Sequence, residues 1–184
     1  NGCMPSMTGF LLPADTNHGY FMFVERELHL IGGIGSNTHL IWNADKQCID
    51  KHWEFKEWED NHWGGLVYIE SKRELLLFGG WSMDDEARYR HCIDKILRYS
   101  FENKQWILLD TRLPVRIQTF AYILTPDEKY IIIFGGWSME SHSDTDDIYI
   151  WDLENMQFRI SDIKSPKKKD LHACVMIYDI DEIV

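Results

Sequence analysis

The sequence contains the same six residues, FGGWSM, twice, at 78–83 and at 134–139. Each copy follows an apolar run, LLL in the first case and III in the second. A third diglycine, Gly32-Gly33, stands 47 positions before Gly79-Gly80, which stands 56 positions before Gly135-Gly136. An internal repeat restricts the fold more than any other feature, because each repeat must form one supersecondary unit that stacks on its neighbours.

Segments on the carboxyl side of the diglycines share one pattern. LIWNADKQCI, LRYSFENKQW and YIWDLENMQF each carry an aromatic residue, a polar turn and a large apolar residue seven positions after the aromatic. The three aromatic–apolar pairs are Trp42 and Ile49, Tyr99 and Trp106, and Trp151 and Phe158. The distance from the second glycine to the aromatic varies between 9 and 19 residues, whereas the last apolar residue precedes the next diglycine by 30 or 29. Exposed loops accept changes in length that strands resist, so one long loop per unit absorbs the variation.

Each unit has the pattern of four strands. In the middle unit we expect strands at 62–70, 75–80, 94–100 and 105–110, with a long loop at 81–92. The run LLLF is apolar at successive positions, which predicts a strand covered on both faces by neighbouring sheets, with aromatic residues of the fourth strand filling the space between sheets. The diglycine would end this strand where the chain needs a positive φ or a close backbone approach. A phosphate loop is not indicated, since neither GxGxxG nor GxxxxGK[ST] is present.

The period, the four strands and the diglycine after an apolar run resemble the kelch repeat of β-propellers. YIIIFGG followed by TDDIYIWD and Phe158 is similar to the family pattern, and LLLFGG with Tyr99 and Trp106 matches it best. The first unit is weaker, because Ile49 stands where the family has tryptophan. The resemblance covers nearly the whole chain.

The resemblance implies an all-β fold: a partial propeller of three four-stranded antiparallel blades with incomplete strands at both ends. The implied units span residues 14–60, 61–114 and 115–166, with the end of a preceding blade in 1–13 and the start of a further blade in 167–184. His18, His62 and His172 stand where kelch units often carry a histidine that opens the first strand. Three blades alone would leave two sheet flanks bare, so we expect a longer parent protein of about six or seven blades.

The resemblance also implies a function, because kelch propellers mostly serve as platforms that hold a partner protein or peptide in loops on one face. The matching positions follow the diglycines or link the blades: Trp81, Ser82, Met83, Trp137, Ser138, Met139 and Arg116. Tryptophan, methionine and arginine are typical interface anchors. The alternative is that Trp81 and Trp137 fold back as plugs against neighbouring blades, since tryptophan is mostly buried in either role.

Two loops carry further candidates. Arg88, Tyr89 and Arg90 would suit an acidic or aromatic group of a partner, although such a loop is more often a solvated excursion. The loop at 140–147 gathers acidic residues around His142, but it has no fixed ligand spacing. We therefore predict no metal and no cofactor.

Charge and missing motifs restrict the function further. The net charge of −11 disfavours nucleic acids and anionic membranes as partners, and no apolar run has the length of a membrane span. The absence of an N-x-[ST] sequon favours an intracellular, cytoplasmic setting. Neither G-x-S-x-G nor H-E-x-x-H is present, so a non-enzymatic module is favoured. The resemblance leaves two alternatives open: a propeller-type enzyme, such as a copper-radical oxidase, sugar epimerase or iron-dependent specifier protein, and an actin scaffold.

Overall fold

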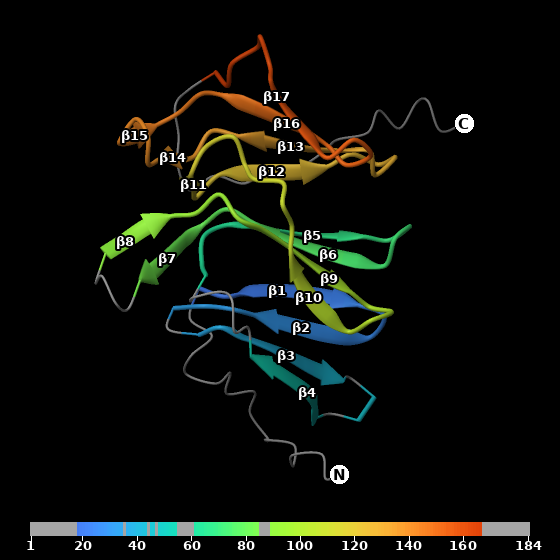
Figure 1. The fold of residues 1–184 in the computed structure, drawn as a ribbon. Coiled ribbons are helices and arrows are strands. Elements are labelled where there is room, and N and C mark those ends of the chain that lie inside the picture. Colours follow the sequence, from blue (N-terminus) through green and yellow to red (C-terminus); the bar gives the residue numbers. More distant parts are fainter. Residues whose placement is uncertain are drawn as a thin grey trace.

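Three four-stranded antiparallel sheets dominate the structure (Figure 1). The computed structural model describes residues 18–34, 36–43, 45–46, 48–54, 61–84 and 89–166. These residues include no helix, and so none with the length and apolarity of a membrane span. The predicted all-β fold of antiparallel sheets is confirmed, and the stacked sheets fit a fragment of a β-propeller.

Each sheet is a meander whose four long strands follow the chain order. The first sheet contains β1 (Tyr20–Val24), β2 (Glu27–Ile31), β3 (Thr38–Asn43) and β4 (Cys48–Glu54). The second contains β5 (Gly65–Ile69), β6 (Glu74–Phe78), β9 (Ile96–Ser100) and β10 (Gln105–Leu108). The third contains β12 (Ala121–Leu124), β13 (Tyr130–Phe134), β16 (Ile148–Asp152) and β17 (Gln157–Ile160). The strands predicted in the middle unit are present, each somewhat shorter than its apolar segment.

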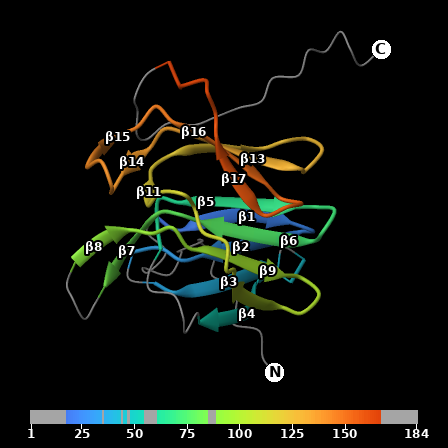
Figure 2. The ribbon, with the colours of Figure 1, turned by 45° about the horizontal axis from the view of Figure 1, so that its top comes forward.

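The prediction of a long loop in the middle unit is wrong in one respect, because the loop contains a β-hairpin. In that loop β7 (Trp81–Asp84) pairs with β8 (Tyr89–Cys92). In the third unit β14 (Trp137–Ser138) pairs both with β15 (Ser143–Asp144) and with β11 (Ile117–Gln118). The two hairpins leave the sheets at the same end (Figures 1 and 2). Backbone pairing builds these hairpins from polar segments, which lack the apolar alternation that reveals a strand in a sequence.

The strand registers show which residues are equivalent in the three sheets. The residue before each diglycine pairs with the first residue of its sheet: Ile31 with Tyr20, Phe78 with Gly65, and Phe134 with Ala121. Two residues before these first positions stand His18, Trp63 and Thr119, so these three are equivalent. The sequence alignment of His18 with His62 is therefore off by one position. The shift becomes visible only in the strand pairing. It matters because a slip of one residue moves a side chain to the other face of the sheet.

The central strand β6 is covered on both faces, as predicted. Leu75, Leu76, Leu77 and Phe78 are each at most 2% exposed. Leu75 and Leu77 belong to the core that the second sheet shares with the first, whereas Leu76 and Phe78 belong to the core shared with the third. The neighbouring sheets therefore supply the cover that a single sheet could not provide.

The core between the first and second sheets contains polar aromatic groups. The buried rings of His29 and His39 are hydrogen-bonded, Nδ1 of His29 to Nε2 of His39, at 2.9 Å. Trp106 donates its indole N–H to Nδ1 of His39 at 3.0 Å, and Tyr99 lies edge-on to His39 with ring centroids 4.9 Å apart. Because an indole N–H can only donate, the His39 proton sits on Nε2 and is donated to His29. Burial raises the pKa of Tyr99 to about 12.

The core between the second and third sheets is almost wholly apolar. Phe78 stacks on Phe120 with ring centroids 5.8 Å apart, and it meets Tyr122 and Trp151 edge-on at 5.3 and 6.0 Å. The Tyr122 hydroxyl donates to the Leu66 carbonyl at 3.1 Å and accepts the Leu66 N–H at 3.0 Å. Aromatic side chains therefore fill the space between sheets, as the repeat predicts.

A diglycine follows the second strand of each sheet, and the first two diglycines bond to the link that leads into the next sheet. All six glycines have positive φ, between 61° and 124°. Gly33 donates its N–H to the Asn61 carbonyl at 3.0 Å, and Gly80 donates to the Ile117 carbonyl at 2.8 Å. A Cβ atom on Gly80 would lie 2.6 Å from the His62 carbonyl oxygen. Both predicted reasons for glycine, a positive φ and a close approach, apply here.

At the opposite end of the sheets, the hairpin turns are also linked. Arg73 donates from Nε and Nη2 to the Glu25 carboxylate at 3.1 and 2.8 Å, which joins the second sheet to the first. Glu128 accepts the N–H groups of Glu70 and Ser71 at 2.8 and 3.0 Å, which joins the third sheet to the second. Burial alone would raise the pKa of Glu128, but these hydrogen bonds hold it below its ordinary value.

Candidate binding surface at the diglycine end

Three equivalent residues lie side by side just before the first strands of the three sheets, β1, β5 and β12. His18, Trp63 and Thr119 have φ values of 60°, 60° and 51°, in the left-handed region. This conformation is rare for residues other than glycine, and above all for a β-branched threonine. Thr119 donates its N–H to the Trp63 carbonyl at 2.8 Å, and Trp63 donates its indole N–H to Nδ1 of His18 at 3.3 Å. Strained backbone of this kind often clusters at functional sites, and here it recurs at the equivalent position of all three units.

Trp63 lies at the centre of an aromatic cluster, which we define as His18, His62, Trp63 and Trp81. The rings of Trp63 and Trp81 are stacked, with centroids 5.1 Å apart and planes 21° apart. His62 lies 4.8 Å from Trp63 and 5.5 Å from Trp81, and its backbone pairs with that of Trp81. His18 is exposed, and Trp63 and Trp81 are partly buried.

The third unit repeats the arrangement without its aromatic centre. Gln118 pairs with Trp137 as His62 pairs with Trp81. Trp137 is partly buried, and its ring lies 6.2 Å from that of His142. In the described part of the chain, Oε1 of Gln118 and Oγ1 of Thr119 are buried and have no hydrogen-bond partner. The surface is therefore asymmetric: the second unit carries the stacked Trp63 and Trp81, whereas the third has Thr119 in place of Trp63 beside its Trp137.

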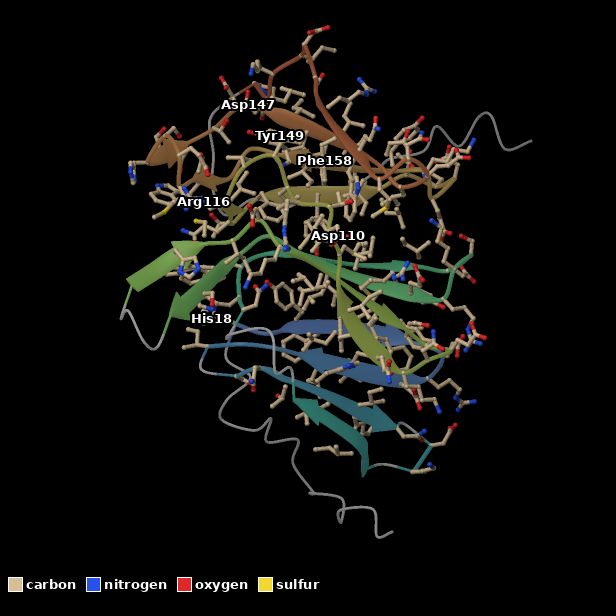
Figure 3. The ribbon with its side chains drawn as sticks, in the orientation of Figure 1. His18, Asp110, Arg116, Asp147, Tyr149 and Phe158 are labelled. Atoms are coloured by element: carbon tan, nitrogen blue, oxygen red, sulfur yellow. The ribbon has the colours of Figure 1, made fainter. Side chains whose placement is uncertain are left out.

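The link before the third sheet places Arg116 at the same end, where Figure 3 also shows His18. Arg116 donates from Nε to the Glu140 carboxylate at 2.8 Å and from its backbone N–H at 3.2 Å. Burial alone would raise the pKa of Glu140, but the bonds from Arg116 hold it below its ordinary value. Met139 donates its N–H to the Arg116 carbonyl at 3.0 Å and is partly buried. Arg116 is thus exposed but already paired.

Two of the predicted binding residues point inward. Ser82 is 2% exposed and Ser138 is 4% exposed. The Ser138 hydroxyl hydrogen-bonds the Glu140 carboxylate at 3.3 Å and accepts the Ser141 N–H at 3.4 Å. Ser138 therefore holds the loop that follows β14, and the predicted contact of the two serines with a partner stays a prediction.

Three of the remaining predicted residues, Met83, Tyr89 and Arg90, lie in the β7–β8 hairpin. The backbones of Met83, Tyr89 and Arg90 belong to paired strands, and their side chains lie outside the description. Arg88 lies outside the described residues. The predicted role of this hairpin stays a prediction.

The acidic loop of the third unit is occupied by internal contacts. Asp147 accepts hydrogen bonds from the Lys164 ammonium, from the Thr145 hydroxyl at 2.9 Å and from the Tyr149 hydroxyl at 3.2 Å. The Lys164 bond is the largest reason that the pKa of Asp147 lies below its ordinary value. Across the described ranges, no three His, Cys, Asp or Glu side chains gather as a metal site would need.

Cys92 is a buried free cysteine at the end of β8. Burial raises the pKa of its thiol to about 12, so the thiol is protonated at neutral pH.

Comparison with known proteins gives a fold but no family. No protein-family model and no curated protein matches this sequence. Among solved structures, the chain is similar to that of YjhT, with a TM-score of 0.69 and 11% sequence identity. The match covers 84% of this chain and 52% of that one, so this chain spans about half the length of YjhT. At such low identity the likeness shows the fold alone.

Sequence reasoning missed Trp63, the centre of the aromatic cluster. It singled out the residues after the diglycines, whereas Trp63 precedes β5. Trp63 faces Trp81 because the start of β5 lies beside the start of β7. The signal in the sequence was the dipeptide His62-Trp63 directly before Gly64-Gly65, an aromatic pair at a point where the backbone turns.

Proposed function

We propose that this chain is a kelch-type propeller fragment that serves as a protein-interaction module and binds a partner protein or peptide at the diglycine end. The observation that carries the proposal is the aromatic cluster: stacked, partly exposed Trp63 and Trp81 beside exposed His18, on strained backbone. Partly exposed tryptophans held in a fixed geometry suit an interface anchor, because little conformational freedom is lost when they bind.

The hairpins support the proposal by framing the cluster. The β7–β8 hairpin begins at Trp81 and the β14–β15 hairpin begins at Trp137, so both leave the sheets beside the cluster. Loops held on a rigid scaffold are a frequent place for binding residues. The exposed Arg116–Glu140 pair would lie at the edge of such an interface and contribute to specificity more than to affinity.

Selection of ligands from a random-peptide display library tests this function. We expect the chain to select peptides whose affinity falls at least about 30-fold in Trp81→Ala, the loss typical of a hot-spot tryptophan. Ile163→Ala is the matched control, because Ile163 is 73% exposed and lies far along the chain in the link after β17. Circular dichroism should be the same for both variants. Undiminished binding by a folded Trp81→Ala variant would remove the aromatic cluster from the proposal.

The enzyme and actin-scaffold alternatives rest on the resemblance, with no further observation in their favour. Metal analysis of the protein and co-sedimentation with actin filaments test them directly.

A further inference from the structure

A series of three hydrogen bonds connects the two chain segments that carry the stacked tryptophans. Gly64 donates its N–H to the Tyr20 hydroxyl at 2.6 Å, and that hydroxyl donates to Oδ1 of Asn61 at 2.7 Å. Nδ2 of Asn61 donates in turn to the Gly79 carbonyl at 3.1 Å. The series therefore starts at the residue after one stacked tryptophan and ends two residues before the other. We call it the Tyr20–Asn61 bridge.

The polar groups of the bridge are buried and closely surrounded. Asn61 is 1% exposed and Tyr20 is 9% exposed. A Cβ atom on Gly64 would lie 2.7 Å from the Tyr20 hydroxyl oxygen, and a Cβ atom on Gly80 would lie 2.6 Å from Oδ1 of Asn61. Burial raises the pKa of Tyr20, so the hydroxyl keeps the proton that it donates. Because a buried polar group that loses its partner is costly, these bonds hold the two segments in one arrangement.

The third unit repeats the backbone around the bridge but not the bridge itself. Gly80 bonds to the Ile117 carbonyl as the first diglycine bonds to the Asn61 carbonyl, so Ile117 is equivalent to Asn61. Gly65 is equivalent to Tyr20, because each is the first residue of its sheet. The side chains of isoleucine and glycine cannot form hydrogen bonds, so no equivalent bridge can form there.

This difference shows what the bridge is needed for. Trp63 and Thr119 both have left-handed φ, so the strained backbone forms with or without a bridge. The stack of Trp63 on Trp81 is found in the unit with the bridge, whereas the third unit, which has no bridge, has Thr119 in place of Trp63. The bridge thus accompanies the stacked rings rather than the strained backbone.

We propose that Tyr20 and Asn61 are positioning residues of the aromatic cluster, and that their bridge holds Trp63 stacked on Trp81. Tyr20 lies in β1, so a side chain of the first sheet fixes a binding surface of the second. The effect on stacking is independent of the binding function. The effect on affinity rests on the proposed function, because an anchor held in its bound geometry loses less freedom when a partner binds.

Circular dichroism of Tyr20→Phe tests the positioning role. Stacked indoles couple their electronic transitions and give an exciton couplet, and the part of the couplet that Trp81→Ala removes belongs to this pair. Tyr20→Phe deletes one oxygen atom and with it two bonds of the bridge. We expect a folded variant that has lost most of this part of the couplet. A folded variant that keeps most of it would contradict the proposal. A variant that does not fold would contradict it as well, since the hydroxyl would then support the whole fold.

Tyr122→Phe is the matched control. The Tyr122 hydroxyl also donates one hydrogen bond and accepts one, and both join β12 to Leu66 of β5. These bonds end at Leu66 rather than at the turn that carries Trp63, so Tyr122→Phe should leave the couplet unchanged. An equal loss of the couplet in Tyr122→Phe and Tyr20→Phe would mean that any lost hydroxyl between sheets loosens the rings, and would overturn the assigned role.

The affinity for a selected peptide extends the test to binding. We expect the affinity to fall about 10-fold in Tyr20→Phe, as for the loss of one hydrogen bond, and to stay unchanged in Tyr122→Phe. Adding Tyr20→Phe to Asn61→Ala should cause no further loss, because both residues act through one bridge. Additive losses of affinity would contradict the bridge. A lost couplet with undiminished affinity would support the positioning role and contradict the proposed binding function of the cluster.

Discussion

The two inter-sheet interfaces use the same backbone positions with different chemistry. His39 in the first sheet stands where Ile96 stands in the second, and Tyr99 stands where Trp151 stands in the third. The first interface therefore contains a hydrogen-bonded series of indole and imidazoles, whereas the second is built of rings and aliphatic side chains. The repeat determines which backbone positions make contact across an interface, but not which side chains occupy those positions. A buried polar pair is tolerated at this position because its ring nitrogens bond to one another and to Trp106.

The largest effect is expected in the apolar interface. Phe78→Ala should lower the free energy of unfolding by about 3–5 kcal/mol, because it leaves a cavity among rings that cannot collapse into it. Ile31→Ala, the equivalent change in the polar interface, should cost about 2–5 kcal/mol and no more than Phe78→Ala. Urea denaturation measures both values. A larger loss from Ile31→Ala would reverse the comparison.

A smaller effect isolates the polar interface. Trp106→Phe keeps an aromatic ring but removes the donor to His39, which should cost about 1–3 kcal/mol for an acceptor left unsatisfied. The loss should shrink in a His39→Leu background, where no acceptor remains at that position. Urea denaturation of the four proteins in this double-mutant cycle gives the coupling energy. Equal losses in both backgrounds would show that the hydrogen bond contributes nothing.

The smallest effect concerns the turns that link the second and third sheets. The pKa of Glu128 is lowered in the folded chain, so its hydrogen bonds stabilise the fold above the ordinary carboxyl pKa of about 4.3 and this contribution disappears as the pH falls through the folded pKa. Glu128→Gln should therefore be less stable than the parent near neutral pH, by less than about 1 kcal/mol, and equally stable in strong acid. Denaturation curves between about pH 3 and 7 measure the difference. A difference that grows in acid would contradict this assignment.

Much of the fold could be predicted from the sequence, because the repeat is marked by residue types that the backbone geometry and the packing of each unit require. The diglycines need positive φ, and the run before Gly79 needs cover on both faces; both features are present. The hairpins could not be predicted, because strands of four residues or fewer in polar segments depend on backbone pairing. The pairing of His29 with His39 and the equivalence of His18 with Trp63 depend on register, which a single sequence specifies only weakly.

The candidate surface was predicted in its location but not in its centre. Trp81 and Trp137 were expected at this end and lie there. Their partners, Trp63 and Gln118, come from the preceding links, and contacts between segments so far apart in the chain follow from the stacking of strand ends rather than from a motif.

The central claim is that successive sheets stack through equivalent faces. Nuclear Overhauser effects between selectively labelled aromatic rings test it most directly. We expect cross-peaks from Phe78 to Tyr122 across the second interface and from His39 to Tyr99 across the first, where ring centroids lie 5.3 and 4.9 Å apart. Cross-peaks from Phe78 and His39 that stay within their own sheets would contradict the stack.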